Sequence, residues 1–143
     1  MTLTAGDVFL CVNPGLSGDD PHYHIVIHTT ENRLVVVTYT TSQIEKVRRR
    51  CQRKEKIRFA HIEPETLVVV EPSDSPSFTK QCAIDCNNVQ MLSEEYYVSS
   101  KSFQKVSSIT NPNLIPRIKS AIAKSRIVEE RIIRIVQSGS TSV

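Results

Sequence analysis

Three histidines share the even positions of one short segment. His22, His24 and His28 lie in the run 22–28, whose odd positions hold tyrosine and isoleucine. Because successive side chains of a strand point to opposite faces, the three imidazoles are expected on one face. Histidine titrates near neutral pH and can both accept and donate a proton there. The segment is therefore a candidate acid–base site, with a solvent-facing edge strand as the alternative interpretation.

For the cysteines and aromatic residues, packing in the core is favoured as a role over metal binding or base stacking. Four cysteines occur without a secretory context, which favours reduced thiols over a disulfide framework. Cys82 and Cys86 are four positions apart, but a zinc site needs two further ligands and no second close pair occurs. We expect neither a metal nor a cofactor. Tyr96, Tyr97 and Phe103 could stack on nucleic-acid bases, although packing is the favoured role.

The net charge of +3 conceals a strong segregation. Residues 44–58 and 101–143 each carry a net charge of +6, whereas residues 1–43 carry −3 and residues 59–100 carry −6. Dense basic segments attract a polyanion such as nucleic acid, or an acidic protein. A merely solvated face is the alternative. The candidate nucleic-acid-binding residues of the first basic segment are Arg48, Arg49, Arg50, Arg53 and Lys54.

Short β-branched runs separated by turns dominate the first hundred residues. This pattern is typical of a small barrel or sandwich, with strands expected at about 7–12, 22–28, 33–41, 66–71, 82–86 and 88–92. Residues 43–60 interrupt it with apolar side chains at helical spacing, which fits either a short basic helix or an extended hairpin arm. Two amphipathic helices are expected after residue 113, and a disordered tail from Ser138.

Several short motifs together resemble one family. They are Gly6-Asp7-Val8 at the first strand, the hairpin of 24–27 with 34–37, the strand exit Thr40-Thr41-Ser42, and the late run Glu-Pro-x-Asp-x-Pro-x-Phe-x-Lys ending at Lys80. These motifs, spread over residues 5–136, resemble the PemK/MazF-like (Kid/CcdB-type) growth inhibitors, in a divergent branch. The resemblance implies an SH3-like barrel and a toxin of a toxin–antitoxin pair. Many such toxins cleave single-stranded RNA without a metal.

The resemblance suggests how the candidate residues would act. RNA cleavage without a metal needs a base, an acid and a cation. His22 and His24 would be the acid–base pair, Lys80 would neutralise the phosphate, and Thr41 or Ser42 would position it. Only Thr40 or Thr41 matches the hydroxyl position of the compact toxins. Their arginine before the second strand is replaced here by the run Asp20-Pro21-His22.

We therefore predict a mostly β protein, a small SH3-like barrel with a C-terminal pair of helices. Residues 1–105 would form the barrel with a basic insertion at 43–60, residues 106–137 a helical extension, and residues 138–143 the tail. The predicted function is a cytoplasmic, homodimeric endoribonuclease toxin with RNA and an antitoxin as partners and no membrane association. The rival is a non-catalytic barrel that binds nucleic acid or a protein through its basic arm. His22, His24 and Lys80 should meet on one concave surface bounded by the loop 13–21.

Overall fold

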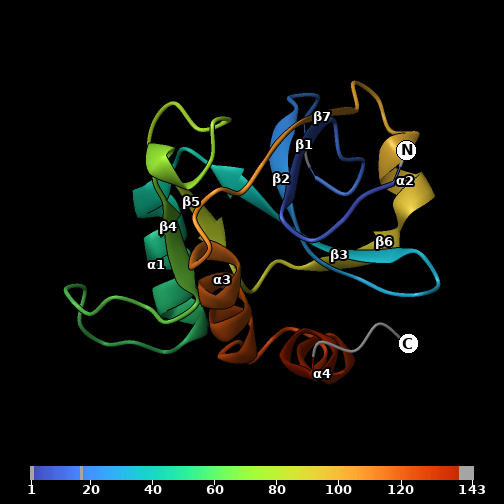
Figure 1. Ribbon diagram of the computed structural model, residues 1–143. Helices are drawn as coiled ribbons and strands as arrows, with labels where there is room; N and C mark the ends of the chain where they lie inside the picture. Colours follow the sequence, from blue (N-terminus) through green and yellow to red (C-terminus); the bar gives the residue numbers. More distant parts are fainter. Residues whose placement is uncertain (1, 17, 139–143) are drawn as a thin grey trace.

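The computed structural model describes residues 2–16 and 18–138 (Figure 1). The six expected strands and both C-terminal helices are present, and the segment left open between helix and hairpin is a helix. The elements in order are β1 (Asp7–Cys11), β2 (His22–Thr29), β3 (Leu34–Thr41), α1 (Ile44–Lys54), β4 (Leu67–Val70), β5 (Cys82–Asp85), β6 (Gln90–Ser93), α2 (Glu94–Val98), β7 (Gln104–Ser108), α3 (Leu114–Ala123) and α4 (Glu130–Ser138).

The strands form an antiparallel sheet of seven, six of them in the order β4-β5-β3-β2-β1-β7 and the seventh, β6, paired with β3 beside this path. One edge of β3 serves two partners, because its first half pairs with β6 and its last residues, Thr40 and Thr41, pair with β5. Within the described ranges β4 and β7 end the path without pairing to each other, so the sheet is open. The prediction of a mostly β fold is confirmed, and a closed barrel is not what these pairings form. Helix α3 packs against β4 and β2.

The two faces of the sheet are covered by different elements, as the period of two in the strands requires. One core lies between the sheet and helices α3 and α4 and includes Ile25, Ile27 and Ile118. The second contains Phe9 and Val26, and Tyr97 of α2 closes it. Helix α1 packs separately on β5 through Val47, Cys51 and Ala83. Apolar side chains spaced three and four apart therefore explain why residues 44–54 are helical.

Helix α4 turns most of its apolar side chains toward the protein itself. Ile132 and Val136 belong to the core beneath α3, whereas Ile127, before the helix, is 55% exposed. The surplus of apolar residues that motivated a homodimer is thus largely used within one chain, and the homodimer stays a prediction.

The C-terminal part of the chain differs from expectation in two elements, α2 and β7, that the sequence analysis omitted. β7 pairs with β1, so the expected boundary at residue 105 falls inside a strand, and the division into barrel and extension stays a prediction. Of the predicted tail, residues 138–143, Ser138 is the last residue of α4, and residues 139–143 lie outside the described part of the chain. None of the helices in the described part of the chain has the length and apolar character needed to cross a bilayer.

Candidate active-site groove

Three of the four predicted catalytic residues line one groove of about 390 Å³. His22 is the first residue of β2, Thr41 is the last residue of β3, and Lys80 lies in the loop before β5. Since β2 and β5 both run antiparallel to β3, the start of each lies beside the end of β3. Sheet topology therefore brings these three residues together. Ser42 also lines the groove.

A smaller hollow of about 230 Å³ adjoins the groove and shares His22, Thr41 and Gln43 with it. It extends the lining toward α1, adding Lys46 and Arg50. We use "the groove" for both hollows together. Lys80 and Asp20 line the larger hollow, Lys46 and Arg50 line the smaller one, and His22 lines both. Such a distribution of charge suits a chain of phosphates.

The groove does not include His24, which corrects the prediction of a paired imidazole site. Its side chain is fully buried and its ring stacks on Phe9, with ring centroids 4.9 Å apart. Nδ1 lies 2.8 Å from the carbonyl oxygen of His22, and Nε2 lies 3.0 Å from the Asn13 amide nitrogen. These contacts fit a neutral ring that donates from Nδ1 and accepts at Nε2. Burial lowers the pKa of His24 to about 4, so the ring is uncharged at neutral pH.

His24 lies outside the groove because it is further from the end of its strand than His22. His22 and His24 do share a face, as their spacing predicts, but His22 lies at the end of the sheet, whereas His24 is two residues further in. There it is enclosed by Phe9 from β1 and Tyr97 from α2. His28, the third histidine, is also buried, at 7% exposure.

Tyr39 is a groove residue that the sequence analysis missed. It lines the hollow beside His22, and the centroids of the two rings are 6.1 Å apart. Burial raises the pKa of Tyr39, against the opposing effect of the Arg50 charge, so the phenol keeps its proton at neutral pH. The phenol can therefore donate a hydrogen bond into the groove. The available signal was the strand period, since Tyr39 and Thr41 are two positions apart on β3.

The predicted nucleic-acid-binding cations of α1 are divided between ion pairs and solvent. Arg48 pairs with Glu45 and Glu63. Arg50 and Lys54 both contact the carboxylate of Asp85, at 3.0 and 3.3 Å. Arg49 and Arg53 are exposed. The charge that α1 presents to a ligand is therefore smaller than the sequence total of its segment suggests.

Asp85 is the buried anchor of this arrangement. Burial alone would raise its pKa, but hydrogen bonds from Asn87, the charge of Lys54 and a hydrogen bond from Arg50 hold the pKa below its usual range. The Asn87 side chain also receives the hydroxyl hydrogen bond of Ser125, which ties α1 and β5 to the connection before α4. Asp85 thus holds Arg50 at the edge of the groove.

All four cysteines are buried and free. Cys82 lines the groove, and burial raises the pKa of its thiol to about 11, which keeps it protonated. Within the described ranges, no group of three or more histidine, cysteine or acidic side chains is placed to hold a metal ion. Of the three aromatic residues considered for base stacking, Tyr97 is fully buried against Phe9.

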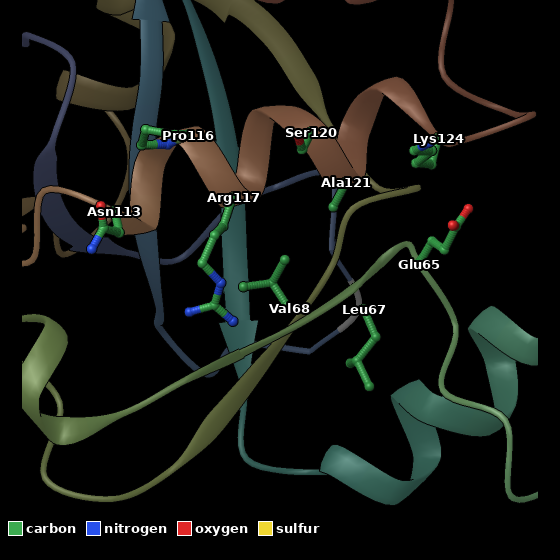
Figure 2. A pocket seen from close by; sticks show the side chains of 9 residues that line it. All are labelled: Glu65, Leu67, Val68, Asn113, Pro116, Arg117, Ser120, Ala121 and Lys124. Carbon is green, nitrogen blue, oxygen red and sulfur yellow. The ribbon is translucent and has the colours of Figure 1, made fainter.

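A larger hollow, of about 540 Å³, lies between β4 and α3 (Figure 2). Arg117 extends from α3 toward Val68 of β4, and Glu65 and Lys124 lie at the far end. Its lining includes none of the candidate catalytic residues. This hollow is therefore separate from the candidate active-site groove.

We compared the chain with protein-family models, curated proteins and solved structures. No protein-family model matches the chain, and no curated protein matches it. A solved structure described as an endoribonuclease in complex with its cognate antitoxin, from a mycobacterial species, is similar over 85% of this chain and 92% of that one. The identity is 16% and the TM-score 0.49, and at this level the similarity carries no argument about activity.

Proposed function

We propose that this chain is a toxin-like endoribonuclease that holds single-stranded RNA in the groove and cleaves it without a metal ion. The observation that carries the proposal is the meeting of His22, Thr41 and Lys80, from three separate segments, around one hollow. An imidazole, a hydroxyl and an ammonium group are the types of side chain that cleavage at a ribose 2′-hydroxyl requires.

The reaction would be transfer of the phosphate to its own ribose. His22 takes the proton of the 2′-hydroxyl, and that oxygen attacks the adjacent phosphorus atom. The bond from phosphorus to the 5′-oxygen then breaks, which leaves a 2′,3′-cyclic phosphate and a 5′-hydroxyl. Lys80 offsets the negative charge that grows on the phosphate, and Thr41 and Ser42 orient it by donating hydrogen bonds. Tyr39, whose phenol stays protonated, donates the proton to the leaving oxygen.

The wider biological assignment rests on the motif resemblance described above. On that basis we propose a divergent relative of the PemK/MazF-like growth inhibitors, whose compact members are SH3-like barrels, acting in the cytoplasm as a homodimer. A protein antitoxin would be its partner.

One observation favours the rival, a non-catalytic module that binds nucleic acid or a protein. Burial of His24 leaves His22 as the single imidazole in the lining of the groove. A groove with one imidazole can bind phosphates even where it does not cleave them.

Purified full-length protein incubated with labelled single-stranded RNA in EDTA separates the two functions. We expect cleavage to persist in EDTA and to yield a cyclic phosphate. His22→Gln should slow it by about 10²- to 10⁴-fold, the usual contribution of an acid–base group. Lys80→Gln should also slow it, whereas Lys101→Gln, an exposed lysine away from the groove, should not.

Three outcomes would contradict parts of the proposal. RNA binding without any cleavage supports the non-catalytic rival. Cleavage that is unchanged in His22→Gln removes the assigned base. Loss of cleavage in EDTA, restored by added magnesium, removes the metal-independent mechanism.

A further inference from the structure

We propose that Phe59, beside His61 on the loop after α1, is a stacking site for a base of single-stranded RNA that leaves the groove along α1. The inference rests on the RNA-binding part of the proposed function and adds a second contact point to it. In Figure 1 the segment between α1 and β4 projects from the body of the protein, at the lower left.

The exposure of Phe59 is the first observation. Its side chain is 59% exposed, and the other large apolar side chains found exposed in the described ranges, Ile62 and Ile127, are aliphatic. The rings of Phe59 and His61 are 5.9 Å apart between centroids and tilted by 40°. Two exposed rings thus stand together on one loop. Aromatic faces presented to solvent are what proteins use to stack unpaired bases.

The loop is held in place by hydrogen bonds, so the ring is presented by a fixed backbone. The buried side-chain amide of Gln52 donates to the carbonyl oxygens of Ala60 and Ile62, each at 2.9 Å. The backbone N–H of Ile62 donates to the carbonyl of Phe59 at 3.1 Å. These bonds tie both sides of the exposed rings to α1. A pre-ordered loop loses less entropy when a ligand binds.

The end of α1 directs the chain into this loop. Lys56 has a left-handed backbone, with φ of 58°, and the N–H of Ile57 donates to the carbonyl of Gln52 at 2.9 Å. This is the pattern of hydrogen bonds by which a helix ends and its chain reverses. The carboxylate of Glu55 accepts from the backbone N–H groups of Glu65 and Thr66 and so closes the base of the loop.

Charge identifies nucleic acid as the ligand. Residues 53–61 carry three cationic side chains that are exposed, Arg53, Lys56 and Arg58, while Lys54 is paired with Asp85. The one carboxylate of this segment, Glu55, accepts hydrogen bonds from the backbone N–H groups of Glu65 and Thr66. The next acidic residue, Glu63, is ion-paired with Arg48. A cationic surround repels a basic partner and attracts phosphates.

A row of cations connects the groove with this loop. Lys46, Arg49 and Arg53 are exposed and are spaced at i, i+3 and i+7, which places them along one side of α1. Lys46 already lines the groove. An α-helix of this length covers roughly 16 Å. RNA that leaves the groove can therefore follow phosphate contacts along α1 and reach Phe59 with a base.

The test measures binding of an uncleavable single-stranded RNA, with a 2′-O-methyl backbone, to the full-length protein. A probe of about 12 nucleotides should bind roughly 5- to 150-fold more weakly to Phe59→Ala than to the wild type, the range expected for loss of one stacked base. Phe59→Trp should retain affinity, and Phe59→Leu should not. Ile62→Ala, in the same loop, is the matched control and should bind like the wild type. A probe of three nucleotides, too short to span α1, should not distinguish any of these variants.

The outcomes separate this inference from the proposed function. Binding that is unaffected in Phe59→Ala overturns the stacking site and leaves cleavage in the groove intact. Full affinity in Phe59→Leu also overturns it, because an apolar contact, such as one made by a protein partner, would then suffice. Binding that depends on Phe59, in a protein that cleaves no RNA, upholds the stacking site and refutes the nuclease. Absence of RNA binding refutes both, provided that thermal unfolding shows the proteins to be folded.

Discussion

The burial of His24 should make the stability of this protein depend on pH between about 4 and 6.5. In the folded protein burial lowers the pKa of His24 from 6.5 to about 4, whereas the unfolded chain keeps the ordinary value. Between these values the unfolded state binds a proton that the folded state does not. The contribution to stability is therefore complete above the unfolded pKa and is lost as the pH falls through the folded pKa. About 2.5 pH units at about 1.36 kcal/mol each amount to roughly 3 kcal/mol.

His24→Phe is the perturbation that isolates this effect. The phenyl ring retains the stacking on Phe9 but cannot titrate. The amide of Asn13 loses its acceptor at this position and keeps its hydrogen bond to Gln90, at 2.7 Å. We therefore expect a loss of about 1–2 kcal/mol at pH 7. The slope of stability against pH between 4 and 6.5 should become much flatter than in the wild type.

Urea unfolding at a series of pH values from 7 to 4 measures the difference. The wild type should lose about 3 kcal/mol more over this range than His24→Phe does. His22→Gln is the control for the nearby charge: because the charge of His22 is a minor cause of the lowered pKa of His24, its removal should flatten the slope much less than His24→Phe does. The lowered pKa of Asp85 acts below this range, because its ordinary value is 3.8. Equal slopes in the wild type and His24→Phe would refute the buried, neutral assignment of His24.

Three further predictions follow from the charges and the exposed apolar residue. Replacing both Arg49 and Arg53 by alanine should reduce the slope of log affinity for RNA against log salt by about 1.4, and an unchanged slope would show that neither contacts phosphate. Asp85→Asn should lower the free energy of unfolding in urea by about 2–3 kcal/mol, because Arg50 and Lys54 lose their buried partner. Glu45→Gln, which removes an exposed ion-pair partner of Arg48, should lower it by less than about 1 kcal/mol. Light scattering should give twice the chain mass of 16.1 kDa at high micromolar concentration and a lower mass for Ile127→Asp, and a monomeric wild type would refute the dimer.

Local periodicity in the sequence predicted most of the strands and helices of the fold. The alternation in residues 22–28 and the β-branched run of β3 predicted their strands, and the spacing of apolar residues predicted the C-terminal helices. The same local information placed Thr41 and His22 at adjoining strand ends, because a hairpin brings the end of one strand beside the start of the other. Elements with weak periodicity, such as α2 and β7, were missed, since neighbours distant in sequence stabilise them.

By itself, then, the sequence determined which residues alternate on a strand, which recur on a helix and where cations accumulate. Only the tertiary structure decided how deep each side chain lies and what it contacts. His22 and His24 have the same face and the same chemistry, but Tyr97, more than seventy positions away, covers one and not the other. Asp85, more than thirty positions away from both, likewise removes Arg50 and Lys54 from the free charge of α1. Burial and pairing arise from contacts between segments far apart in the chain, which no local pattern encodes.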